Sequence, residues 1–217
     1  MRVLVACEFS GVVRRAFQAL GHDAWSCDIL PAEDCDTPDP LIRGKLATKH
    51  IQADVLGVLY GPWLREPEPW DLMIAHPPCT HLAVSGARWF KEKVKEQAEA
   101  LEFVQRLLDA PVPRIALENP ISVISSKIRK PTQIIHPWMF GHGEVKATCL
   151  WLKNLPPLAP TMVVEGREPR VWKMGPSPDR WKERSRTLPG IAAAMAAQWG
   201  GLEIEQPELC VSGDSSQ

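Results

Sequence analysis

The sequence contains no run of apolar residues that approaches the roughly 20 needed to span a bilayer. Its six cysteines form no Cys-x-x-Cys pair, so neither a disulfide framework nor a standard zinc pattern is indicated. Met1 and Arg2 lead directly into strand-like sequence, without the apolar segment of a signal peptide. These absences argue against the membrane and secreted classes, and we expect a soluble protein of the reducing cytoplasm.

Neither sign of charge dominates, because 25 Lys and Arg residues balance 26 Asp and Glu residues. The charge is unevenly distributed, however: residues 114–186 hold 13 basic and 6 acidic residues, while residues 1–113 hold 12 and 16. A basic segment in a nearly neutral protein is typical of a polyanion-binding face, but ordinary surface scatter gives the same count. Charge alone therefore leaves nucleic-acid binding open.

The length of 217 residues and the apolar content of 45% are those of one globular domain. Four strand-like apolar runs occupy residues 2–7, 23–29, 70–75 and 114–118. Residues 12–20 and 90–108 carry apolar side chains at helical spacing. The first of these segments lies between the first two runs, and the second lies between the last two. This alternation predicts an α/β fold with a doubly wound parallel sheet, whose ligands bind beyond the carboxyl ends of the strands.

The second half of the chain changes in composition. Residues 131–187 are rich in proline, tryptophan and basic side chains, and we interpret them as a small irregular substrate lobe. Residues 188–199 form a small-residue helix that is expected to pack back on the sheet. We therefore expect one domain over residues 1–200, followed by a mobile tail at 201–217.

A tight turn follows the first strand, in Cys7-Glu8-Phe9-Ser10-Gly11, and leads into a helix. Backbone amides at such a helix start favour an anionic ligand group, and an acid after the second strand, Asp28, can accept from ribose hydroxyls. This arrangement suits a cofactor that contains a nucleoside, although the single glycine does not make a Gly-x-Gly-x-x-Gly motif. Asp54 is either a second contact, to a base amino group, or a solvated loop carboxylate.

The segment His76-Pro77-Pro78-Cys79-Thr80-His81 directly follows a buried strand. Two prolines stiffen the chain there and place the Cys79 thiol at the edge where ligands collect, which indicates a nucleophile that its surroundings must activate. The next strand ends in Glu118, a carboxyl placed to hold a substrate during attack. The alternative is a zinc site made by His76, Cys79 and His81 with Cys149 or His142; the spacing matches structural zinc patterns poorly, and we expect no metal.

In chain order, these segments resemble the cytosine-C5 DNA methyltransferase superfamily over about residues 1 to 200, and most closely its short phage-type members. The resemblance implies S-adenosylmethionine, or a modified sulfonium analogue, as cofactor and DNA as partner, in the cytoplasm of a bacterial or phage-infected cell. It implies that Cys79 adds to C6 of cytosine while Glu118 engages N3. The implied cofactor contacts are Glu8, Phe9, Ser10, Gly11, Asp28, Ile29, Asp54, Val55 and Pro78.

The sequence departs from this family most in size. Roughly thirty residues lie between Lys153 and Arg184, where larger relatives insert a recognition domain, so few side chains can reach base edges and we expect short or relaxed specificity. Lys146-Ala147-Thr148 stands where the family has Gln-Arg-x-Arg. Trp172 and Trp181 are candidate stacking surfaces. The expected DNA contacts are Arg88, Lys146, Thr148, Arg180, Arg184 and Arg186.

Three other functions remain open from the sequence. Enzymes that methylate N4 of cytosine or N6 of adenine use a related Pro-Pro motif followed by an aromatic residue, a position that Cys79 takes here. The same C5 chemistry on a free cytosine nucleotide would need no recognition domain. A catalytically silent DNA-binding module could keep the fold, although it would have no need of both Cys79 and Glu118.

Overall fold

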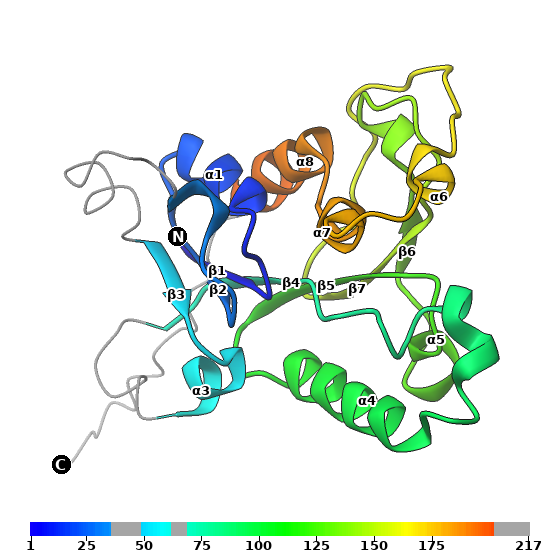
Figure 1. The fold of residues 1–217 in the computed structure, drawn as a ribbon. Helices are drawn as coiled ribbons and strands as arrows, with labels where there is room; N and C mark the ends of the chain where they lie inside the picture. The colour runs from blue at the N-terminus through cyan, green and yellow to red at the C-terminus, as the bar shows by residue number, and fades with distance from the viewer. Residues whose placement is uncertain (36–48, 62–68, 202–217) are drawn as a thin grey trace, which may run out of the picture.

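The computed structural model describes residues 1–35, 49–61 and 69–201, except for the side chains of Cys35, Arg88, Trp89, Val171 and Trp172. The tail predicted at residues 201–217 therefore lies, apart from Gly201, outside the described residues. Within these ranges the chain folds as a central sheet with helices on both faces (Figure 1).

Seven described strands form one sheet in the order β3-β2-β1-β4-β5-β7-β6. Strands β1 to β5 run parallel, whereas β7 is antiparallel to both of its neighbours, β5 and β6. This arrangement is that of the Rossmann-like methyltransferase sheet, so the predicted fold class is confirmed. The strands are β1 (Arg2–Ala6), β2 (Asp23–Asp28), β3 (His50–Gln52), β4 (Leu72–Ala75), β5 (Arg114–Pro120), β6 (Gln133–Ile135) and β7 (Thr148–Lys153).

The helices cover the two faces of the sheet because the side chains of each strand alternate between them. In β1, Val3 and Val5 pack toward α1 and α8, while Leu4 and Ala6 pack toward α3 and α4. These two pairs of helices lie on opposite sides of the sheet (Figure 1). Helix α8 packs on the sheet, as the small-residue segment predicts, and it also lies against α1. The helices are α1 (Val12–Ala19), α3 (Val55–Tyr60), α4 (Val94–Leu108), α5 (Ile124–Lys127), α6 (Arg170–Lys173), α7 (Arg180–Ser185) and α8 (Pro189–Gly200), with 3-10 turns η1 (Glu33–Cys35), η4 (Val84–Trp89) and η5 (Pro137–Met139).

The lobe is smaller than residues 131–187 because β6 and β7 belong to the central sheet. Strand β7 pairs with β5 from Ile115 to Pro120 and is buried over most of its length. The strand predicted at 114–118 therefore extends through Pro120, whose missing amide is tolerated at the strand end. What remains outside the sheet is the segment between β6 and β7 together with residues 154–187, which carries α6 and α7 (Figure 1).

Candidate active site

The candidate site follows the carboxyl ends of the parallel strands. Cys7 follows β1, Asp28 ends β2, the His76–Cys79 segment follows β4, and Glu118 lies near the end of β5. Since parallel strands end at one edge of a sheet, these residues gather there although they are distant in sequence. The site has two halves, one at β1 and β2 and one at β4 and β5.

The first half is acidic and centres on Cys7. This residue has a φ of 60°, a left-handed conformation that side chains other than glycine rarely adopt and that clusters at functional sites. Burial and the negative charges of Asp28 and Asp54 raise the pKa of the Cys7 thiol. Burial also raises the pKa of Asp28, whose carboxylate accepts a hydrogen bond from the Leu30 amide at 2.9 Å. The carboxylates of Asp28 and Asp54 therefore both lie near Cys7, beyond the end of β1.

Glu8 turns its carboxylate back to the start of α1. It accepts from the amides of Val13 at 2.7 Å and Arg14 at 3.2 Å. These are the amides for which the sequence predicts an anionic ligand group, so that interpretation is corrected: the anion at this helix start is a side chain of the protein itself. Glu8 can therefore shape the loop after β1, but its carboxylate is already hydrogen-bonded to the amides of α1.

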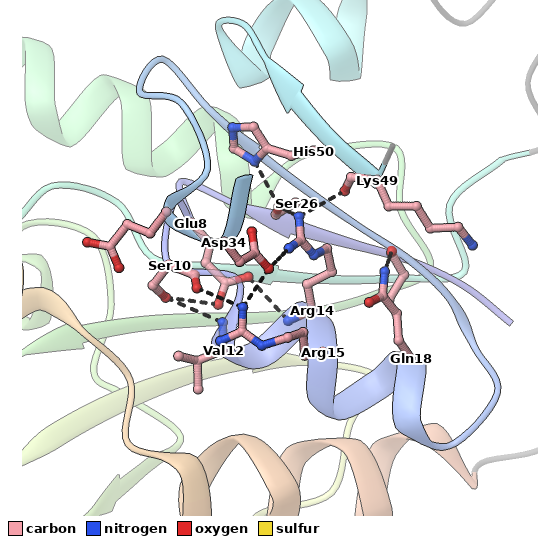
Figure 2. A network of polar contacts seen from close by, with 12 residues as sticks. Glu8, Ser10, Val12, Arg14, Arg15, Gln18, Ser26, Asp34, Lys49 and His50 are labelled. Carbon is pink, nitrogen blue, oxygen red and sulfur yellow. Dashed lines mark hydrogen bonds and ion pairs between the residues drawn. The ribbon is translucent and has the colours of Figure 1, made fainter. Parts of the chain in front are cut away.

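A buried arginine, Arg14, joins helix α1 to β2 and to η1 (Figure 2). Its guanidinium donates to Ser26 Oγ at 3.0 Å and pairs with Asp34, which also pairs with Arg15 at 2.5 Å. Burial would raise the pKa of Asp34, but the two arginines outweigh it and hold that pKa below its usual value. Ser26 Oγ also lies 2.8 Å from Nδ1 of His50 in β3. Sequence reasoning missed this network, because its members come from separate elements.

Four further predicted cofactor contacts differ in their surroundings. Ile29 follows Asp28 and is 74% exposed, which leaves an apolar side chain open beside the acid. Asp54 caps α3, accepting from the Leu56 amide at 3.0 Å, and remains exposed. Val55 is a buried core residue and presents no side-chain surface to a ligand. Pro78 is exposed in the loop after β4.

The second half of the site joins the ends of β4 and β5. Ala75 pairs with Leu117 in the sheet, so the residues that follow, His76 and Glu118, come side by side. His76 Nδ1 lies 3.0 Å from Glu118 Oε2, with only 9% and 12% of the two side chains exposed. The side-chain amide of Asn119 donates to the Pro77 carbonyl at 2.9 Å and ties the two loops together.

Electrostatics link Cys79 to Glu118. Burial and the negative charge of Glu118 raise the pKa of the Cys79 thiol, and the cations Lys146 and Arg184 only partly oppose the rise. Burial would also raise the pKa of Glu118, but the hydrogen bond from His76 and the charge of Lys146 outweigh burial and lower it. The resting site therefore holds a protonated thiol beside an ionised carboxylate.

Lys146 is fixed beside this pair by donating to the Arg184 carbonyl at 3.0 Å. Glu118, Lys146 and Thr148 line a cavity of about 10 Å³ that is closed by residues from the start of α8. Such a cavity holds about one water molecule and is too small for a pyrimidine ring.

The expected DNA contacts fall into different environments. Arg186 donates to both carboxylate oxygens of Glu33, at 2.5 and 3.1 Å, and these bonds raise the pKa of Arg186. Arg186 thereby joins the lobe to η1. Thr148 is buried in β7, and its hydroxyl donates to the Lys146 carbonyl at 3.3 Å. These two residues are therefore structural rather than free to meet phosphates.

Two of the other expected contacts lie on α7. Arg180 and Arg184 are half-buried on α7, and the side chain of Arg88 lies outside the described residues. Trp181 is 51% exposed, and its ring centroid lies 5.8 Å from that of Phe9. Helix α7 thus lies against the candidate cofactor loop. The stacking proposed for Trp172 concerns a side chain outside the described part of the chain.

The described ranges contain no helix long and apolar enough to cross a membrane. Nor does any group of three His, Cys, Asp or Glu side chains in residues 1–35, 49–61 and 69–201 have the arrangement of a metal site. The alternative zinc site is therefore not formed, since His76, Cys79, His81, His142 and Cys149 all lie in these ranges.

No family model matches the chain, and no curated protein matches it. Among solved structures it is similar to a proposed DNA modification methyltransferase encoded within a prophage of E. coli, with 13% sequence identity and a TM-score of 0.49. The match covers 76% of this chain and 52% of the other, so this chain spans about half the length of that protein. A likeness this distant assigns no function, and the methyltransferase fold stands on the strand order described above.

Proposed function

We propose that this protein is an S-adenosylmethionine-dependent enzyme that methylates C5 of cytosine in DNA through a covalent adduct with Cys79. The observation that carries the proposal is the placement of Cys79 in the loop after β4 and of Glu118 near the end of the adjacent strand β5, where the charge of Glu118 raises the pKa of the Cys79 thiol. A nucleophile and a carboxyl that can hold the base are the two groups that this chemistry needs.

The acidic half of the site fits the cofactor. When bound, S-adenosylmethionine supplies a methyl group on a positively charged sulfonium. Asp28 would accept from the ribose hydroxyls, and the exposed side chain of Ile29 offers an apolar surface to the adenine ring. The negative charges of Asp28 and Asp54, which already act on Cys7, would favour the sulfonium over a neutral ligand.

Cys79 would begin the reaction on the base. It must first lose its proton, because a thiol with a raised pKa is a weak nucleophile, and the charges of Lys146 and Arg184 favour that loss. The thiolate would then bond to C6, and the electron pair of the C5–C6 double bond would move to C5. Bound S-adenosylmethionine would supply the methyl group there, its sulfur keeping the electron pair of the broken sulfur–methyl bond. A base removes the C5 proton, the double bond forms again, and the Cys79 thiolate leaves.

The lobe, together with Arg88 of η4, would hold the DNA strand. We propose Arg88, Arg180 and Arg184 as phosphate contacts and Trp181 as a stacking surface for a base that has left the helix. Flipping a base costs a few kcal/mol, which contacts in the pocket and to the phosphates offset. Because the lobe is short, we expect recognition of a short or relaxed sequence.

The test is to incubate DNA, and separately free cytosine nucleotides, with labelled S-adenosylmethionine and to identify the modified nucleoside by mass. We expect 5-methylcytosine in DNA, lost in Cys79→Ala and kept in Thr80→Ala, which changes the exposed neighbour of the thiol. An N4- or N6-methylated product that survives Cys79→Ala would replace the proposal with amino methylation. Label only in free nucleotides would change the substrate, and salt-sensitive DNA binding without turnover would indicate the silent module.

A further inference from the structure

One histidine beside the acidic half of the site has no role in the chemistry above. His50 begins β3, which pairs with β2 so that His50 lies opposite Ser26. Its ring contacts two groups at once: Nδ1 lies 2.8 Å from Ser26 Oγ, and Nε2 lies 2.9 Å from the carbonyl oxygen of Leu30. The ring therefore joins β2 to the turn that follows that strand.

The partners of the ring determine which nitrogen carries the proton. A guanidinium can only donate, so Arg14 donates to Ser26 Oγ at 3.0 Å (Figure 2). Ser26 is fully buried, and His50 is the one acceptor that the described residues offer to its hydroxyl, so Ser26 donates to Nδ1. The carbonyl of Leu30 can only accept, so Nε2 carries the proton and donates to it. A neutral imidazole with its proton on Nε2 satisfies all three bonds.

The turn after β2 carries the acid that is proposed to bind the ribose. Asp28 Oδ1 accepts from the Leu30 amide at 2.9 Å, which makes residues 28–30 an Asx turn. Leu30 is thus held on two sides, by its amide on Asp28 and by its carbonyl on His50. Because His50 fixes the residue whose amide holds the carboxylate, His50 acts through Leu30 on the orientation of Asp28.

Two further bonds reach this turn from the chain after His50. The Ala53 amide donates to the Asp28 carbonyl at 3.0 Å, and the exposed side chain of Gln52 donates to the Ile29 carbonyl at 3.3 Å. Of the three bonds, only that of His50 continues into the interior, through Ser26 to Arg14. A ring that is held on its other side by buried groups is fixed in place before a ligand arrives.

We propose that His50 is a positioning residue for the cofactor: it holds the turn at residues 28–30 in the conformation that presents the Asp28 carboxylate to the ribose hydroxyls of S-adenosylmethionine. This inference rests on the proposed function, because it concerns the cofactor half of the same site. It also gives the buried pair of Arg14 and Ser26 a task, which is to orient the imidazole. A carboxylate that is already oriented loses little freedom on binding, so the effect belongs to cofactor affinity rather than to methyl transfer.

Two conservative substitutions separate the two bonds of the ring. The amide of glutamine reaches the position of Nε2, so His50→Gln keeps a donor for Leu30 and loses the acceptor for Ser26. The shorter amide of asparagine reaches the position of Nδ1, so His50→Asn keeps the acceptor for Ser26 and loses the donor for Leu30. His50→Phe keeps a planar ring with neither group. The control is His22→Gln, since His22 precedes β2 at the opposite end of that strand.

The measurement is the dissociation constant of S-adenosylmethionine by calorimetry, together with KM and kcat of methyl transfer to DNA. We expect His50→Gln and His22→Gln to bind the cofactor within about twofold of the wild-type protein. His50→Asn and His50→Phe should weaken binding by about tenfold, the effect of one lost hydrogen bond. The KM for the cofactor should rise in the same two variants, while kcat and the KM for DNA stay unchanged.

A second readout follows the ring itself. Proton–nitrogen NMR spectra of the protein without cofactor should show His50 at neutral pH as the neutral form with its proton on Nε2. His50→Phe identifies the signals by their loss. A proton on Nδ1 would overturn the inference, because the lone pair of Nε2 would then face the Leu30 carbonyl.

Unchanged cofactor affinity in His50→Phe would also overturn the inference. Equal losses in His50→Gln and His50→Asn would do the same, because the bond to Leu30 would then not be the cause. Thermal unfolding identifies the folded variants, and the comparison of Gln with Asn remains decisive if the Phe variant does not fold. The proposed function fails separately, when the wild-type protein binds S-adenosylmethionine but forms no 5-methylcytosine in DNA.

Discussion

Arg186 and Glu33 form a bidentate ion pair that connects the end of α7 to η1, the turn after β2. The two side chains are 29% and 30% exposed, so the pair is only partly screened by water. Glu33 is next to Asp34, which pairs with Arg14 and Arg15 of α1. These ion pairs thus connect the lobe, through η1, to helix α1.

Arg186→Ala should therefore lower the free energy of unfolding by about 1 kcal/mol, the range of a bidentate pair near the surface. Urea unfolding measures this, and Glu33→Ala should cost a similar amount, with little further loss in the double variant. Lys95→Ala, which breaks an exposed pair with Glu99, is the control and should change little. If Arg186→Ala instead weakened DNA binding and Glu33→Ala did not, Arg186 would be a DNA contact after all.

Gly11→Ala should destabilise the fold by about 1–3 kcal/mol, because Gly11 has a φ of 68° and an added Cβ would lie 2.7 Å from side-chain atoms of Arg14 and Asp34. Gly57→Ala, in α3 with nothing within 4 Å, should stabilise by about 0.5–1 kcal/mol. Thermal unfolding of both variants compares the positions directly. A stable Gly11→Ala protein would contradict the tight packing of the loop after β1.

The alkylation rate of Cys79 should respond in opposite directions to its two charged neighbours. Glu118→Gln removes a charge that raises the pKa of the thiol, so iodoacetamide should react faster at neutral pH. Lys146→Gln removes a charge that lowers the pKa, so the reaction should slow. Each change should be about three- to tenfold, the effect of a pKa shift of up to about one unit. Peptide mass spectrometry over a pH series gives the rates, and changes of the same sign would refute this account.

Asp28→Asn should stabilise the folded protein at neutral pH and weaken the binding of S-adenosylmethionine by about tenfold or more. Burial raises the pKa of Asp28, so its charged form opposes folding above that pKa, and the penalty disappears as the pH falls through it. The stabilisation should accordingly shrink in acid. Thermal unfolding with and without the cofactor tests both effects, with Asp109→Asn, at the exposed end of α4, as the control. Unchanged cofactor binding would remove Asp28 from the proposed site.

The strand ends were the part of the site that the sequence predicted well. Buried apolar runs located β1, β2, β4 and β5, and since parallel strands end at one edge of a sheet, the pattern predicts Cys79 and Glu118 at the same edge. The same rule put Asp28 beside the loop after β1. The local sequence pattern was sufficient for this placement because each residue lies near the end of its strand or in the loop that follows it.

Contacts between separate elements could not be predicted in this way. The partners of Arg14 lie in β2 and η1, and the carboxylate of Glu8 looks like a ligand contact until its bonds to α1 are seen. Strand β7 was placed in the lobe because its reversed direction breaks the alternation that located the other strands. Arg186 carries the right charge for DNA, but only the folded chain brings Glu33 to it.

The raised pKa of Cys79 has a consequence for an enzyme of the proposed kind. Such an enzyme keeps an electrophile and a sulfur nucleophile within one pocket, and a permanently ionised cysteine there would be alkylated by its own donor. A thiol that stays protonated until a base arrives is protected from this self-inactivation, because the thiolate is the reactive form. The burial that slows the attack on C6 thus also preserves the catalyst between turnovers.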